Sequence, residues 1–213
     1  MRRGKITKRL DAKWLAFGKP PSWRYPATKF GELTIAEPGY GSGARATTMQ
    51  TGLEPRYIRI TDFDDDGIPD DNEYTTPEVV EADCFLEAND MLFARSGATV
   101  GKTYLHQDVS HPAIFAGYCI RFRFDVGKVL PLYAWFFTKT AAFSHWVQTI
   151  QRPSGQPNIN KQEFKSVELP LPPLVKQREL VDAMETARTA RRTKLAEADA
   201  LLAGLDQYLL DTL

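Results

Sequence analysis

An acidic run in the N-terminal half has the spacing of a calcium-binding loop. Residues 62–67 read Asp-Phe-Asp-Asp-Asp-Gly, and Glu73 occupies the twelfth position. In calcium loops, carboxylates at these positions surround the cation, and a helix flanks the loop on each side. Here residues 57–61 are predicted as a strand, and Pro69 closely follows the glycine. We therefore interpret the run as an acidic, solvated β-turn, with a calcium site as the alternative.

A second segment is similar to a phosphate-binding loop. Residues 96–103 read Ser-Gly-Ala-Thr-Val-Gly-Lys-Thr, with three residues between the glycines. The Walker pattern requires four, because its backbone N–H groups must surround a phosphate. The sequence also offers no convincing acidic strand to hold magnesium. These features argue against nucleotide hydrolysis.

Other catalytic signatures are incomplete. Glu163-Phe164-Lys165 is half of a nuclease motif, but the upstream aspartate is missing at ordinary spacing. The chain has no Asn-Pro-Pro-aromatic tetrapeptide for methylating an exocyclic amine, and no G-x-G-x-x-G after a strand. The three histidines lack Asp or Cys partners at ligand spacing. We expect neither a catalytic centre nor a metal site.

Three loops, 39–45, 95–102 and 152–161, carry side chains suited to DNA. Lysine and arginine neutralise phosphates, small residues allow close backbone approach, and amide or guanidinium groups pair with base edges. The net charge is zero, with 27 basic and 27 acidic residues, so any DNA-binding face must be local. The predicted DNA contacts are Tyr40, Ser42, Arg45, Arg95, Ser96, Thr99, Lys102, Arg152, Ser154, Gln156, Asn158, Asn160 and Lys161.

The elements that must position these loops are mostly short strands. Runs such as 57–60, 91–94 and 119–124 alternate with Gly, Pro and Asp clusters, which predicts a strand-rich α+β domain over residues 1–168. Residues 131–148 are predicted as one helix with an aromatic, core-facing side. Cys84 and Cys119 lie in runs that we interpret as buried strands, which favours reduced thiols and a cytoplasmic location.

The C-terminal part has a different composition. Residues 169–173 read Leu-Pro-Leu-Pro-Pro, which cannot be helical throughout and predicts a stiff hinge. Residues 174–213 contain no proline and predict one long coiled-coil-type helix of about 60 Å. Its heptad seam, with one stutter, is expected to pair with another helix; the alternative is that the helix folds back on its own domain. The predicted helix-pairing residues are Leu180, Met184, Ala187, Leu195, Ala198, Leu202, Leu205 and Leu209.

Four segments together resemble the specificity (S) subunit of type I restriction-modification systems. They are residues 57–62, 90–102, 156–160, and 169–173 followed by Gln177. Their order and spacing match one repeat of that family, and the resemblance extends from about residue 29 onward. Such a resemblance implies a target-recognition domain that reads one half of a split DNA site, followed by a spacer helix.

The resemblance also implies partners. Two methyltransferase (M) subunits clamp onto such an S subunit, and motor-nuclease (R) subunits join them for restriction. S-adenosylmethionine, ATP and magnesium would then be used by those partners, leaving this chain non-catalytic and without a cofactor of its own. Its direct ligand would be double-stranded DNA.

The chain departs from the usual pattern because it has one recognition domain and one spacer helix instead of two of each. We expect either a half-subunit that forms a homodimer on a palindromic, interrupted site, or the N-terminal half of a longer chain. The helix pattern still runs at Leu213, which keeps the second alternative open. A recognition fragment of a fused methyltransferase-nuclease is a further alternative, and a calcium-binding or scaffolding coiled-coil protein is another.

Overall fold

A four-stranded antiparallel sheet lies at the centre of the domain in the computed structural model, which describes residues 22–64, 66–69, 73–150 and 157–212. The strand order is β2 (Gly39–Tyr40), β9 (Cys119–Phe122), β6 (Met91–Ala94) and β7 (Thr103–Leu105). All four residues of β6 are buried, as expected for an apolar strand between two neighbours. The predicted strand at 91–94 is therefore confirmed.

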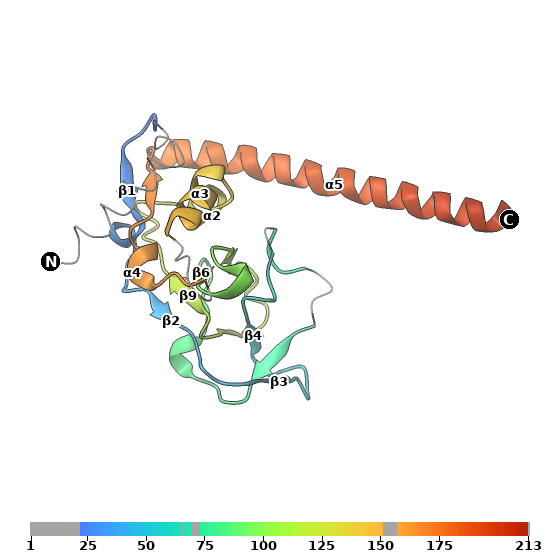
Figure 1. The fold of residues 1–213 in the computed structure, drawn as a ribbon, viewed down its shortest axis with the longest axis horizontal. Helices are drawn as coiled ribbons and strands as arrows, with labels where there is room; N and C mark the ends of the chain where they lie inside the picture. Colours follow the sequence, from blue (N-terminus) through green and yellow to red (C-terminus); the bar gives the residue numbers. More distant parts are fainter. Residues whose placement is uncertain (1–21, 65, 70–72, 151–156, 213) are drawn as a thin grey trace.

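Three two-stranded sheets surround this centre (Figure 1). Strand β1 (Ala27–Lys29) pairs with β10 (Glu168–Pro170), and β3 (Ala46–Thr48) pairs with β5 (Thr75–Pro77), both antiparallel. Strand β4 (Arg56–Ile58) runs parallel to β8 (Ala113–Phe115). The 3-10 helices are η1 (Phe30–Glu32), η2 (Ala82–Cys84) and η3 (Gly97–Thr99). The α+β fold class is confirmed.

The helix predicted over residues 131–148 is two helices. Helix α2 (Pro131–Phe137) and helix α3 (Ala141–Ile150) are separated by residues 138–140. The hydroxyl of Thr138 donates to the carbonyl of Trp135, and that of Thr140 donates to the carbonyl of Phe137. Side-chain hydroxyls that bond nearby carbonyls compete with the helical backbone ladder, a conflict that helical periodicity alone does not reveal.

The two cysteines are free and buried. Cys119 lies in β9 as predicted, whereas Cys84 lies in η2 and not in a strand. Burial raises the pKa of both thiols, because the interior solvates a thiolate poorly. Both side chains are therefore small apolar core residues.

Helix α5 (Leu174–Thr212) crosses helix α2 and then projects beyond the domain (Figure 1). The predicted hinge segment starts inside β10, where Leu169 pairs with Thr28. Gln177, in the first turns of α5, is 0% exposed. The domain thus holds the first part of α5, whereas the C-terminal part of the helix extends away from the domain.

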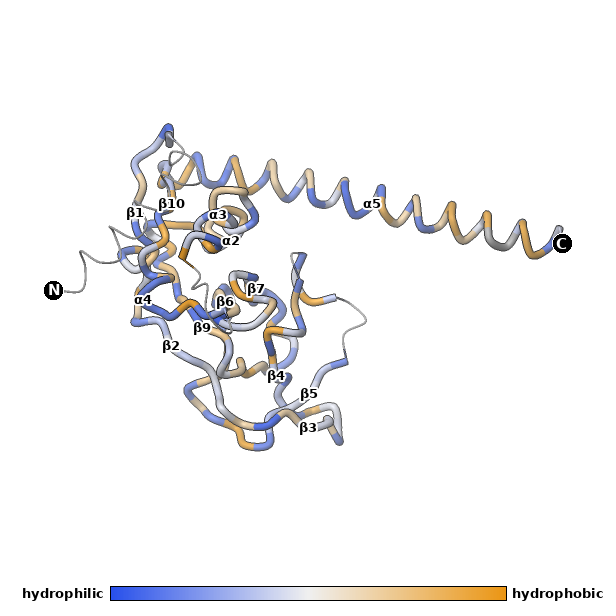
Figure 2. The backbone as a smooth tube through the Cα atoms, in the orientation of Figure 1, coloured by the Kyte–Doolittle hydropathy of each residue, from blue (hydrophilic) through white to orange (hydrophobic). Residues whose placement is uncertain are grey.

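The eight predicted helix-pairing residues are all exposed, from Leu180 at the start to Leu209 near the end. Apolar positions recur along α5 and are most frequent near its C-terminus (Figure 2). Within the described residues, no helix combines the length and apolar character that a membrane span requires.

Candidate nucleic-acid interface

Two of the three predicted DNA-contact loops lie against each other at the end of β6. Ser96 forms an isolated antiparallel bridge with Asn158. The backbone N–H of Ile159 donates to the carbonyl of Arg95 at 2.8 Å, and that of Gly97 donates to the carbonyl of Pro157 at 3.1 Å. These bonds bring together residues 95–97 and 157–159, which are about sixty positions apart in the sequence. The two segments meet at the end of the central sheet where β6 ends.

Two aromatic rings and a carbonyl group hold Arg95 at this end of the sheet. Its guanidinium carbon lies 4.9 Å from the ring centre of Tyr40 and 5.9 Å from that of Tyr118. Its Nε donates to the carbonyl of Gly117 at 3.1 Å. No described residue accepts a hydrogen bond from its two terminal nitrogens. A half-buried arginine held in this way presents a preformed cationic fork, the group best suited to a phosphate or a guanine edge.

The two tyrosines leave much of their surface open. Tyr40 is 43% exposed and Tyr118 is 59% exposed. Sequence analysis selected Tyr40 but missed Tyr118, which lies in the turn that leads from β8 into β9. The only local sequence feature that points to Tyr118 is an aromatic residue directly after a glycine, Gly117.

Lys161 joins the same group from the N-terminus of helix α4 (Lys161–Phe164). Its Nζ lies 5.7 Å from the ring centre of Tyr40 and 3.6 Å from a carboxylate oxygen of Glu37. Lys165 also binds Glu37, at 2.7 Å, and this hydrogen bond is the main cause of the lowered pKa of the glutamate. The Glu37 carboxylate therefore partly neutralises Lys161, and Arg95 is the less compensated cation of the group.

We define this group, Tyr40, Arg95, Tyr118 and Lys161, as the Arg95 cluster. It draws on β2, the end of β6, the turn before β9 and the start of α4. The combination of cations with exposed aromatic rings resembles surfaces that hold nucleic acid through phosphates and ring faces.

Two of the predicted serine contacts are buried. Ser42 is 1% exposed, and its hydroxyl donates to Glu81 at 2.6 Å and accepts the N–H of Ala44 at 3.1 Å. Ser96 is 3% exposed. Both hydroxyls are enclosed by the protein in this conformation, so neither belongs to the exposed surface around Arg95.

Asn160 is also used by the fold. Its side-chain oxygen accepts the N–H groups of Gln162 and Glu163, while Glu163 accepts the N–H of Asn160, which completes a capping box for α4. Pairing with an adenine edge requires the same oxygen to accept a further hydrogen bond. In this conformation Asn160 therefore starts α4, and its side-chain oxygen is already engaged by the two backbone N–H groups.

The other predicted contacts have different surroundings. Arg45 is exposed next to β3, in a different sheet from the Arg95 cluster, while Thr99, Lys102 and Asn158 are half-buried. Arg152, Ser154 and Gln156 lie outside the described residues. Among the predicted amides in the described residues, Asn158 is the one whose backbone bridges directly to the segment of Arg95, at Ser96.

The acidic run is only partly solvated, which corrects the sequence-based interpretation: Asp64 is exposed, whereas Asp62 and Asp66 bind other parts of the fold. Asp62 is 3% exposed and binds Arg59 at 2.8 Å. Asp66 binds helix α5 through Arg191, and this hydrogen bond is the main cause of its lowered pKa. In the described part of the chain, which omits positions 65 and 70–72, no metal-binding group of His, Cys, Asp or Glu occurs.

The segment similar to a phosphate loop connects strands β6 and β7 of the central sheet and contains η3. A phosphate-binding loop leads from a strand into a helix whose N-terminus faces the phosphate. This hairpin loop contains only the three-residue 3-10 helix η3 and leads into a strand, so it offers no such helix. The glycines of this segment serve the backbone instead, since Gly97 and Gly101 adopt φ angles of 75° and 88°.

The chain matches a known protein family over most of its length. Residues 55–197, more than half of the chain, match the family model described as the type I restriction modification DNA specificity domain. The chain belongs to this family. The predicted resemblance to S subunits is thereby confirmed, and a DNA specificity domain is a recognition module without catalytic activity.

Solved structures share the fold. The chain is similar to one from a study of complex assembly and conformational transition of the type I R-M system, with 20% identity and a TM-score of 0.64, covering 99% of this chain and 53% of that one. The HsdS subunit from Thermoanaerobacter tengcongensis is 16% identical with a TM-score of 0.53, covering 89% and 46%. The type IIG restriction endonuclease BpuSI is 7% identical with a TM-score of 0.50, covering 85% and 28%.

The chain therefore spans about half the length of the two type I proteins named above. No curated protein matches it at a significant level. At these identities, the structural comparisons establish the fold of the specificity domain and of its attached helix.

Proposed function

We propose that this chain reads one half of a bipartite DNA target and docks methyltransferase subunits of a type I restriction-modification enzyme in the cytoplasm. The observation that carries the proposal is the Arg95 cluster, in a domain whose family is defined by DNA specificity. The terminal guanidinium nitrogens of Arg95 would bind a backbone phosphate of the DNA, and the exposed ring faces of Tyr40 and Tyr118 would line the adjacent surface. Base reading would then fall to Asn158 and to the loop that precedes it.

The same proposal assigns the chemistry to partners. Methyl transfer from S-adenosylmethionine would occur on the M subunits, and ATP use and magnesium-dependent cleavage on the R subunits. The second half of the DNA target would be read by a second recognition domain, either in another copy of this chain or in a longer chain. The exposed apolar positions of α5 support pairing with another helix, because their burial removes apolar surface from water.

The test of this function uses the chain co-purified with the M subunit of the same system. We expect the complex to methylate one interrupted motif in random DNA, palindromic if two copies of the chain pair. In the same complex, Arg95→Ala is expected to lower DNA affinity and to reduce the slope of log affinity against log salt by about 0.9, because one phosphate contact is lost.

The matched control is Lys29→Ala, which removes an exposed cation from β1, a strand that contributes no residue to the Arg95 cluster. This variant should keep the wild-type salt slope. An Arg95→Ala complex with an unchanged slope would remove Arg95 from the DNA interface. A wild-type complex that modifies no defined motif would contradict the function itself.

A second candidate is the recognition portion of a fused methyltransferase-nuclease, suggested by the fold similarity to the type IIG enzyme. In that case, the chain would not assemble with a separate M subunit. Stable assembly with a separate M subunit, measured by co-purification, favours the type I function, whereas its absence favours the fused enzyme.

A further inference from the structure

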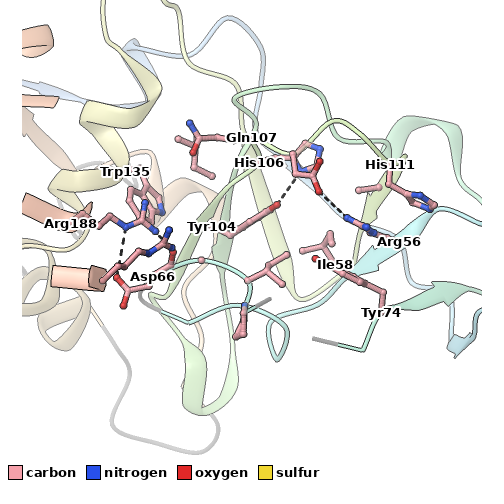
Figure 3. A pocket seen from close by; sticks show the side chains of 17 residues that line it. Arg56, Ile58, Asp66, Tyr74, Tyr104, His106, Gln107, His111, Trp135 and Arg188 are labelled. Carbon is pink, nitrogen blue, oxygen red and sulfur yellow. Dashed lines mark hydrogen bonds and ion pairs between the residues drawn. The ribbon is translucent and has the colours of Figure 1, made fainter. Parts of the chain in front are cut away.

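The acidic loop of the domain grips helix α5 far from the start of the helix. The carboxylate of Asp66 binds Arg191 at 2.8 Å. Arg188 donates to the backbone carbonyl of Asp66, and these two residues lie side by side in Figure 3. The guanidinium carbon of Arg188 also lies 4.7 Å from the ring centre of Trp135 in α2. We name this set, Asp66, Arg188, Arg191 and Trp135, the Asp66 latch.

A second attachment holds the beginning of the helix. The side chain of Gln177 accepts the N–H of Leu130 at 2.8 Å and donates to the carbonyls of Lys128 and Pro172 at 3.1 and 2.9 Å. Arg191 follows Gln177 by 14 positions, or about 21 Å along the helix axis. One attachment would leave the helix free to tilt about it, whereas two separated attachments define its direction.

The latch is polar and lies at the lining of a cavity. This cavity of about 400 Å³ is lined by Gly67, Ile68 and Pro69 of the loop, by Tyr104 from β7 and by Arg192 of the helix, among others (Figure 3). The contacts of Asp66 with Arg188 and Arg191 link the loop to the helix beside this cavity. Arg188 is the better shielded partner, with 19% of its side chain exposed, against 60% for Arg191.

We propose that the Asp66 latch fixes the direction of α5 relative to the recognition domain and thereby restricts the spacing between the two DNA half-sites. This inference rests on the proposed function, in which paired helices connect two recognition domains. Position 200 lies 23 positions beyond Gln177, or about 35 Å along the axis. A tilt of about 10° would move it by about 6 Å, compared with about 3.4 Å for one base pair.

The latch is tested first by a distance within one chain, without DNA. Spin labels at Val79→Cys, an exposed position after β5 on the β3–β5 side of the domain and away from the Gln177 attachment (Figure 1), and at Ala200→Cys on the helix report the helix direction. Dilution with unlabelled chain removes distances between copies. The native cysteines are buried with raised thiol pKa values, so they react slowly. We expect one narrow distance distribution in the otherwise wild-type chain.

Asp66→Ala and, separately, Arg191→Ala are expected to broaden this distribution by about 6 Å, and high salt should act similarly by screening the ion pair. The control is Glu73→Ala, which removes an exposed carboxylate close to the same loop and should leave the distribution narrow. Equally narrow distributions in all four chains would overturn the latch.

The consequence for DNA is measured with the methyltransferase complex and half-sites separated by one or two base pairs more or fewer than in the mapped motif. We expect the wild-type complex to lose about tenfold in affinity for each altered spacing, of the order of one mismatched base pair, and Asp66→Ala to lose about threefold or less. Equal discrimination by both complexes would overturn the role in spacing. A wild-type complex without a bipartite motif would instead contradict the proposed function, while the distance measurement would still decide whether the latch exists.

Discussion

Replacing Gln177 by leucine is expected to lower the free energy of unfolding by about 3 kcal/mol, although leucine has a similar size and is more apolar. The side chain is 0% exposed and forms three hydrogen bonds with backbone groups. Leucine would leave the N–H of Leu130 and the carbonyls of Lys128 and Pro172 without this partner. Each buried polar group left unsatisfied costs about 1–3 kcal/mol. Urea unfolding of the full chain, followed by circular dichroism, measures the change.

The neighbouring Arg178→Ala variant is the control, because Arg178 is exposed on the same helical turn. Its effect should stay within about 0.5 kcal/mol, as for most surface substitutions. A loss below about 1 kcal/mol in Gln177→Leu would show that the three backbone groups find other partners. Gln177 would then not be the attachment that holds the first turns of α5.

Phe93→Ala is expected to destabilise the domain by about 3–5 kcal/mol, the range for removing a buried phenylalanine ring. Phe93 lies at the centre of β6 with 0% of its surface exposed. Its ring centre lies 4.9 Å from those of Phe122 and Phe164 and 5.9 Å from that of Phe30. These contacts connect the central sheet with η1 and α4, so the cavity would weaken the support of the Arg95 cluster as well.

Thermal and urea unfolding of Phe93→Ala and Phe93→Leu separate packing from general hydrophobicity. Leucine retains most of the apolar volume and should cost less than half as much as alanine. Ile35→Ala, at a position that is 67% exposed, should have little effect. Similar losses in all three variants would contradict a tightly packed core around Phe93.

Some features of the fold could be predicted because neighbouring residues determine them. The long C-terminal helix was predicted from 174 to 213 and observed from Leu174 to Thr212, because proline excludes helix before it and strong helix formers follow. The segment 90–102 supported the family resemblance, and the structure shows which contacts its residues make within the fold. Asp90 is 2% exposed and binds Arg123, while Gly101 has a positive φ and no space for a Cβ beside Val147.

Other features depended on contacts between distant segments. Periodicity predicted an aromatic face over residues 131–148 but could not reveal the break at residues 138–140, where the hydroxyl of Thr138 lies 2.7 Å from that of Thr103, 35 positions away. Composition suggested Ser42 as a DNA contact, whereas the fold encloses it beside Glu81, 39 positions away. Local sequence specifies the residue type but not the partner that long-range packing supplies.

The sequence by itself therefore determined the family, the strand-rich domain, the long helix and the apolar positions along it, because these follow from local propensity, periodicity and short motifs. Only the tertiary structure decided that Tyr118 joins Tyr40 around Arg95, and that Asp66 binds α5. The physical reason is the same in both cases. These contacts join segments that are brought together by strand pairing and by the packing of the core, which no short stretch of sequence encodes.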